Sequence, residues 1–240
     1  MRSPAAWVRS PPRPWLAGGP DSAARATTSR EQAVELIDVE LIDVRIIEGP
    51  PFCALSLNLH RLDPADPEAL ADYERAFYAA FVRAKANLLA RRLWHWDDSA
   101  GRLRTRIPYA DQVVFLLCDP VDAGLGAVDT AIALNCRLAE HQSAILGFEP
   151  PPPLEGHCEI LALFSRRDAD LSGLRNFMRT AAQQALALGL KTADATCTDR
   201  LLPVYRHIGG QPLDTSTIDG ERRTRLRFKL ETMAQLERLT

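Results

Sequence analysis

The fold is decided by residues 158–213, which read CEILALFSRRDADLSGLRNFMRTAAQQALALGLKTADATCTDRLLPVYRHIGGQPL. The elements that we predict around this stretch are, in chain order, a buried strand (157–165), a helix (171–190), a second strand (191–198) and a short helix (200–210). Gly189 is the expected end of the first helix. A helix that connects two strands usually makes them parallel neighbours in one sheet. The stretch therefore predicts a parallel strand pair.

The flanking segments predict antiparallel strands and one long helix. Asp66 is the expected N-cap and Pro67 the first residue of an amphipathic helix, whose apolar stripe runs to Leu89 and which ends near Trp94 and Trp96. Further expected elements are two strands within 33–62, a hairpin of 111–120 and 126–141, an extended proline-rich connector at 148–156 and a last strand at 224–231. The fold class that follows is α/β (α+β), with a mixed, mostly antiparallel sheet flanked by helices.

Composition excludes several classes of function. The net charge of −2 gives no global field toward nucleic acid or an anionic membrane. The 5 cysteines are widely spaced and form no CxxC, so we expect neither a disulfide framework nor a metal site. No apolar run approaches the roughly 18 residues that a membrane span needs. We expect a cytoplasmic protein with residues 1–30 as a disordered lead, rich in Pro, Ser, Gly and Arg, and residues 31–240 as a single domain.

Residues 158–213 resemble the C-terminal half of the GNAT superfamily of acyl-CoA-dependent acyltransferases, including the ending VYRHIGG at 204–210. The resemblance implies that the two parallel strands splay apart and that an acyl thioester lies between them. The acyl donor would be acyl-CoA or an acyl carrier protein, with no metal. The residues that would hold the donor are Leu161, Leu163, Ser165, Arg166, Arg167, Ser172, Gly173 and Leu174. A helix N-terminus suits a pyrophosphate, although a Ser-capped helix with solvated arginines is the alternative.

Two residues are candidates for catalysis. By the resemblance, the Tyr205 phenol would give a proton to the departing thiolate, and Glu159 would receive the amine proton through water. Packing alone could also explain Tyr205, and Glu159 could lie at the hydrated end of its strand.

Residues 81–117 resemble the N-terminal part of acyl-homoserine lactone synthases and the related long-chain N-acyl amino acid synthases. The resemblance places the acceptor near Arg83, Trp94, Trp96, Asp111 and Arg137. The indoles could instead fix the helix to the sheet, and the arginines could form surface ion pairs. Arg104 and Arg106 stand where the family has an acidic pair for cationic S-adenosylmethionine, which they would repel. We therefore expect a different amine as acceptor, one that carries a carboxylate.

The function expected from these residues is an N-acyltransferase that acts on the amine of a small-molecule acceptor. The alternative is a non-catalytic GNAT-like module that binds an acyl carrier or a ligand. Neither a nucleic-acid partner nor a membrane span is expected, and the chain is either a monomer or a homodimer.

Overall fold

The computed structural model of the chain describes residues 59–118, 128–137, 140–152, 154–165 and 171–236. The predicted lead at 1–30 and most of the two strands expected within 33–62 lie outside these residues. Only the end of the second expected strand is described, as β1 (Leu59–Arg61). No helix within the described ranges is long and apolar enough to cross a membrane.

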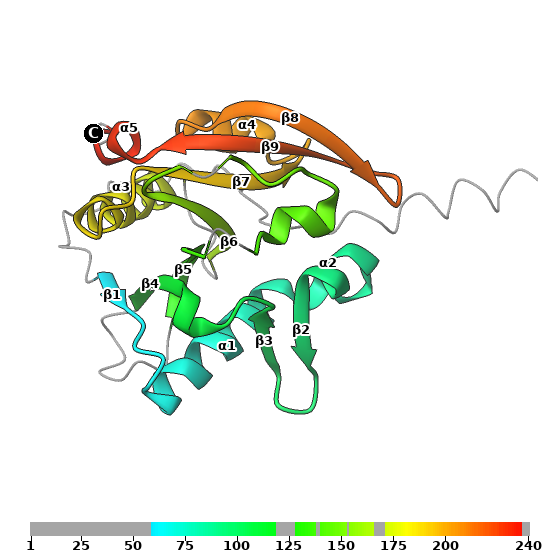
Figure 1. The fold of residues 1–240 in the computed structure, drawn as a ribbon. Coiled ribbons are helices and arrows are strands. Elements are labelled where there is room, and N and C mark those ends of the chain that lie inside the picture. The colour runs from blue at the N-terminus through cyan, green and yellow to red at the C-terminus, as the bar shows by residue number, and fades with distance from the viewer. Residues whose placement is uncertain (1–58, 119–127, 138–139, 153, 166–170, 237–240) are drawn as a thin grey trace, which may run out of the picture. The chain divides into compact units, whose positions relative to one another are not determined.

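A seven-stranded sheet has the order β1-β4-β5-β6-β7-β9-β8 (Figure 1). Its further strands are β4 (Gln112–Cys118), β5 (Val128–Asn135), β6 (His157–Ser165), β7 (Thr192–Thr198), β8 (Gln211–Ile218) and β9 (Glu221–Lys229). Only the β6–β7 pair is parallel, and every other pair in this sheet is antiparallel. The predicted mixed, mostly antiparallel sheet and its β4–β5 hairpin are confirmed. The sequence did not predict β8, because this edge strand is largely exposed and lacks an apolar face.

The helices cover both faces of the sheet. They are α1 (Pro67–Phe81), α2 (Leu88–Leu93), α3 (Leu171–Ala187), α4 (Leu202–His207) and α5 (Leu230–Ala234), with short 3-10 helices η1 (Val82–Ala86), η2 (Tyr109–Asp111) and η3 (Gln142–Leu146). The Asp66 side chain caps α1 by accepting from two backbone N–H groups, as expected. The single long helix is a wrong prediction. The Asn87 side chain accepts from the N–H groups of Leu89 and Ala90, so a second helix begins there.

The two tryptophans lie in a strand, which corrects the prediction that they end the helix. β2 (Trp94–Asp97) and β3 (Arg102–Thr105) form a separate antiparallel hairpin. Its turn contains Gly101 at φ 60°. Trp94 is buried and Trp96 is partly buried, so the hairpin places one indole in the core.

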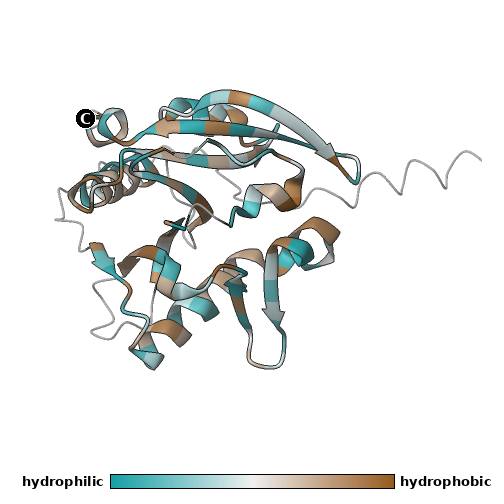
Figure 2. Cartoon of the chain, viewed as in Figure 1, coloured by the Kyte–Doolittle hydropathy of each residue, from teal (hydrophilic) through white to brown (hydrophobic). Residues whose placement is uncertain are grey.

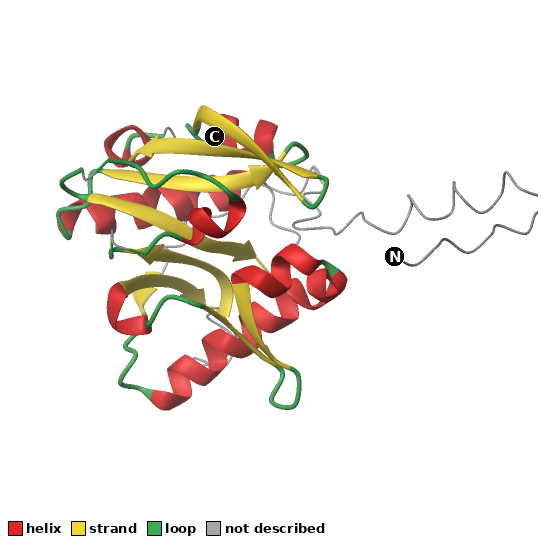
Figure 3. Ribbon diagram, turned by 45° about the vertical axis from the view of Figure 1, so that its right-hand side comes forward, coloured by secondary structure: helices red, strands yellow, loops and turns green. Residues whose placement is uncertain are grey.

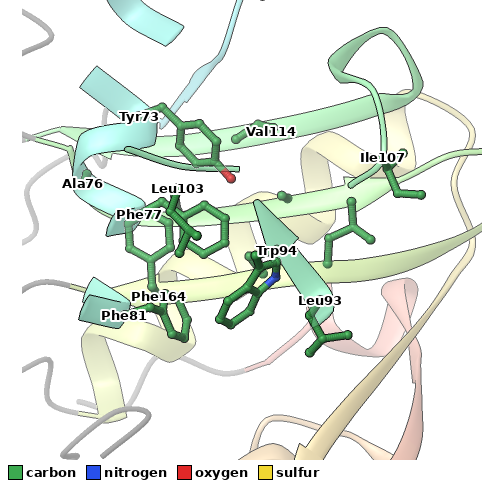
Figure 4. Packing of buried hydrophobic residues seen from close by; sticks show 14 of the residues in the cluster. Tyr73, Ala76, Phe77, Phe81, Leu93, Trp94, Leu103, Ile107, Val114 and Phe164 are labelled. Carbon is green, nitrogen blue, oxygen red and sulfur yellow. The ribbon is translucent and has the colours of Figure 1, made fainter. Parts of the chain in front are cut away.

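The core has two parts, one on each face of the sheet. Figure 3 shows the helices that cover these two faces. On the α1 face, Phe77 and Phe164 stack with ring centroids 5.4 Å apart, and Trp94 packs against Phe81 at 4.6 Å (Figure 4). The α3 face is built from apolar side chains of α3, β7, α4 and β9. Along β9, arginines alternate with residues that are mostly apolar (Figure 2). Because Leu226 and Phe228 face α3, the arginines at 223, 225 and 227 face the other side.

Candidate active site

β6 and β7 diverge after a short paired segment. The parallel register covers three pairs, His157↔Thr192, Cys158↔Ala193 and Glu159↔Asp194. Beyond them β6 continues to Ser165 and β7 to Thr198, with no pairing to each other. The splay expected for this strand pair is confirmed. It leaves backbone groups of both strands facing a gap.

A β-bulge in β6 lies directly after the paired segment. Leu134 of β5 faces Ile160, whereas the preceding Ala133 faces Ala162, so Leu161 is the extra residue. The side-chain amide nitrogen of Gln142 donates to the Leu161 carbonyl oxygen at 2.9 Å. A bulge bends its strand and increases the local twist. The bulge therefore accounts for the direction in which β6 leaves β7.

A pocket occupies the gap between the diverging strands. β6 contributes residues 160–163 to its wall and β7 contributes residues 195–198. Phe81, Trp94 and residues of α2 line it from the α1 face, and Tyr205 of α4 lines it from the α3 face. The pocket thus reaches both layers of the core.

Tyr205 is fixed by its backbone and its ring. The Gly210 N–H donates to the Tyr205 carbonyl oxygen at 2.8 Å, and a Cβ atom at Gly210 would come within 2.9 Å of the Phe228 ring. The Tyr205 side chain is buried, and its ring meets Phe228 edge-on. Its hydroxyl makes no hydrogen bond to the described part of the chain. Burial, with a smaller effect of Cys197, raises the pKa of the phenol well above its ordinary value. The hydroxyl is therefore protonated at neutral pH.

Glu159 lies in β6 just before the bulge, and its side chain does not line the pocket. Its two carboxylate oxygens accept from the backbone N–H groups of Gln142 and Ser143, each at 2.7 Å. Asn135 donates to the same carboxylate at 3.4 Å, and the His141 ring nitrogen is 3.8 Å away. The carboxylate thus satisfies the first N–H groups of η3. These contacts hold Gln142 against the bulge.

The residues predicted to bind the acceptor are not brought together. Among them only Trp94 lines the pocket. The Trp96 indole donates to the Ala90 carbonyl, and Arg137 pairs with Asp111 at 3.1 Å on the surface. Arg83 is exposed.

The two arginines that replace the family's acidic pair also lie away from the pocket. Arg104 is exposed, and the Arg106 guanidinium donates to the Arg92 carbonyl at the surface. These two arginines, which we expected to attract an anionic acceptor, are therefore not part of the pocket.

Two of the residues predicted to hold the acyl donor line the pocket. Leu161 and Leu163 are these two residues. Ser165 is the last residue of β6, and its hydroxyl oxygen is 3.0 Å from the hydroxyl oxygen of Thr130 in β5. Ser172 and Gly173 belong to the first turn of α3, and Leu174 is buried in the core. Arg166 and Arg167 lie outside the described residues.

Gln142 and Arg223 line the pocket but were missed by the sequence analysis. Gln142 begins the short 3-10 helix η3, for which the sequence shows no recognisable pattern. Arg223 carried a usable signal, because the arginines at 223, 225 and 227 occupy every second position of the strand and therefore point to one face. Among the described residues, no group of three or more His, Cys, Asp or Glu side chains is placed to hold a metal ion.

The arrangement of strands and helices defines a class of protein. The chain has the GNAT-like acyltransferase fold. No protein-family model and no curated protein matches the chain. Solved structures do match, and several acyl-homoserine lactone synthases among them have a fold similar to that of this chain.

Two such structures are described as CoA-dependent acyl-homoserine lactone synthases. BjaI, solved with MTA, is 16% identical, with a TM-score of 0.56 over 73% of this chain and 85% of its own. MesI is 14% identical, with a TM-score of 0.57 over 73% of this chain and 92% of its own. A third structure, the synthase LasI, is 14% identical, with a TM-score of 0.54 over 72% of this chain and 88% of its own.

Proposed function

We propose that the chain is an N-acyltransferase that moves an acyl group from a thioester, acyl-CoA or acyl carrier protein, to the amine of a small molecule. The observation that carries this proposal is the pocket between β6 and β7 with the Tyr205 side chain in its wall. A thioester is carried on a long, narrow pantetheine arm, which suits a gap between two strands.

The donor would enter as an additional strand. Beyond Glu159 in β6 and Asp194 in β7, the backbone N–H and C=O groups form no hydrogen bonds from one of these strands to the other. They can pair with the two amides of a pantetheine arm, as an extended peptide pairs with a sheet edge. The start of α3 comes after β6 in the chain and would hold a pyrophosphate, because a helix N-terminus favours an anion.

The reaction would proceed by direct attack. The amine nitrogen adds to the thioester carbonyl carbon, the new C–N bond forms and the C–S bond breaks. The Tyr205 hydroxyl gives its proton to the departing sulfur, and the surplus proton on nitrogen returns to the phenolate through water. The same apolar surroundings that raise the phenol pKa also disfavour a bare thiolate, so proton transfer accompanies C–S cleavage.

The roles of Glu159 and Ser172 are proposed separately from this step. Glu159 would support the site through η3, and its part as a base through water remains a prediction. Ser172 and Gly173 would belong to the donor site at the start of α3.

The proposal predicts that the purified chain releases free thiol from acyl-CoA only when an amine is present. Acyl-CoAs from acetyl to dodecanoyl would be incubated with amino acids and simple amines, and the thiol would be measured with a chromogenic disulfide. The matching N-acyl product would be identified by mass spectrometry. The same assay would be run with acyl carrier protein thioesters. If a donor of either kind binds but no amine induces thiol release from it, the chain is the non-catalytic alternative, and the catalytic proposal is wrong.

A further inference from the structure

Basic residues gather in one part of the chain, although the net charge of the whole chain is −2. Residues 82–106 contain seven Lys and Arg residues, two Asp residues and no Glu. They form η1, α2 and the β2–β3 hairpin, and α2 lies beside that hairpin (Figure 1). A local excess of positive charge attracts anions even where the chain as a whole does not.

Carboxylates neutralise part of this charge. The ion pairs of the segment are Lys85–Asp98 at 2.7 Å, Arg92–Asp219 at 2.9 Å and Arg102–Glu74 at 3.9 Å. The Asp97 carboxylate accepts from two groups of the hairpin turn. Arg91, Arg104 and Arg106 are exposed, and none of them forms an ion pair with the described part of the chain.

These arginines lie close together on the outside of α2 and the hairpin. Arg91 Nε donates to a carbonyl of η1 at 2.9 Å, and the Arg106 guanidinium donates to the carbonyls of Arg91 and Arg92. Arg104 faces His95 across the hairpin. Burial, together with the positive charges of Arg106 and Arg104, lowers the pKa of His95. We call the cluster of Arg91, Arg92, Arg104 and Arg106 the basic surface.

The helix α2 has two different sides. Ala90 and Leu93 are buried and line the pocket between β6 and β7. Leu88 is exposed, and Arg91 and Arg92 lie on the same side of the helix because they follow it by three and four positions. One helix thus lines the pocket with its inner side and carries part of the basic surface on its outer side.

Two large apolar side chains are exposed next to the arginines. Leu88 is 66% exposed, and Val82, the first residue of the neighbouring η1, is 39% exposed. An arginine can lay its apolar stem along a hydrophobic surface while its charged end stays in water. Exposed apolar residues among arginines are typical of a surface that binds the interface of a membrane.

Other anionic partners suit this surface less well. Single-stranded nucleic acid stacks its bases on exposed aromatic rings, whereas Trp94 and Trp96 pack against the core. An acidic protein would need a preformed pocket for the projecting Leu88 side chain. A lipid layer accepts such a side chain without one.

We propose that the basic surface, together with Leu88 and Val82, binds an anionic lipid bilayer. The arginines contact the phosphate groups of the lipids, and the two apolar side chains enter the headgroup region. Because the inner side of α2 lines the pocket, a long-chain acyl product would form next to the bilayer in which it dissolves. Membrane binding goes beyond the proposed acyltransferase function and does not depend on it.

The test is co-sedimentation of the full chain with lipid vesicles. We expect binding to vesicles of phosphatidylcholine mixed with phosphatidylglycerol, little binding to phosphatidylcholine alone, and release at high salt, which screens the charges. Arg91→Gln and Arg104→Gln together should lower the partition coefficient by about 10- to 30-fold, since each arginine near an anionic bilayer contributes about fivefold. Leu88→Ser should lower it by about 3- to 10-fold, because an apolar side chain no longer enters the lipid.

Matched variants control for net charge and for apolar surface. Arg206→Gln and Lys229→Gln together remove two exposed positive charges from α4 and from the end of β9. Leu188→Ser removes an apolar side chain that is 46% exposed just after α3. Both controls should bind within about twofold of the wild type, and thermal unfolding would verify that every variant is folded.

No binding of the wild type to the mixed vesicles, or binding that the Arg91 and Arg104 substitutions leave intact, would overturn the inference. If the wild type binds no vesicles and these substitutions lower activity toward acyl carrier protein thioesters but not toward acyl-CoA, the partner is an acidic protein, and the inference is wrong. Vesicle binding is measured without donor or amine. Binding by a chain that releases no thiol would therefore support the membrane surface and refute the acyltransferase proposal.

Discussion

Replacing Tyr205 by phenylalanine is expected to lower kcat by about 10²- to 10⁴-fold, the range that a positioned proton donor usually contributes. KM for the amine should change little, because the phenol acts on the departing sulfur. Stability should be nearly unchanged, since the hydroxyl makes no hydrogen bond to the described residues and the ring packing against Phe228 is kept. Steady-state kinetics of thiol release and a thermal unfolding curve measure the two effects.

Tyr78→Phe provides the control for this substitution. The Tyr78 hydroxyl donates to Asp98 at 3.1 Å in an exposed position outside the pocket. Its loss should leave kcat at the wild-type value. If Tyr205→Phe retained kcat within about threefold of the wild type, the phenol would not be the proton donor.

Replacing Glu159 by alanine is expected to destabilise the fold by about 3 kcal/mol or more, because two backbone N–H groups lose a charged acceptor in a buried place. The N–H groups belong to Gln142 and Ser143, so η3 and the bulge in β6 should both lose their support. Urea unfolding of the variant and the wild type would measure the lost free energy of unfolding, provided that both curves have the same m-value. Glu155→Ala is the matched control, since the Glu155 side chain is 91% exposed.

Glu159→Gln separates support from catalysis. Its amide nitrogen would face one of the two N–H donors, so a purely supporting role predicts lower stability together with lower activity. A variant that unfolds like the wild type but loses kcat by 10²-fold or more, with an altered pH profile, would show that Glu159 acts as a base. That result would contradict the supporting role.

The sequence predicted the elements whose signals are local. Asp66 followed by Pro67 sets the start of α1, and Gly189, at φ 83°, follows the end of α3. The strand-helix-strand order of β6, α3 and β7 predicts their parallel pairing. These features depend on neighbouring residues or on chain order, so a single sequence reveals them.

Features that depend on tertiary contacts were missed or misplaced. The helical periodicity continues past Phe81, but capping by Asn87 and the pairing of Trp94 with Thr105 override it. Arg223 meets Gln142 and Trp94 only because β9, η3 and the β2–β3 hairpin converge at one gap. No spacing within the sequence encodes that convergence.

The most direct test of the account is a crystal structure with a non-reactive thioether analogue of acyl-CoA. We predict that the pantetheine arm lies between β6 and β7 beyond the Glu159–Asp194 pair, with its sulfur facing the Tyr205 hydroxyl. An arm bound elsewhere on the chain, or a sulfur directed away from Tyr205, would contradict it.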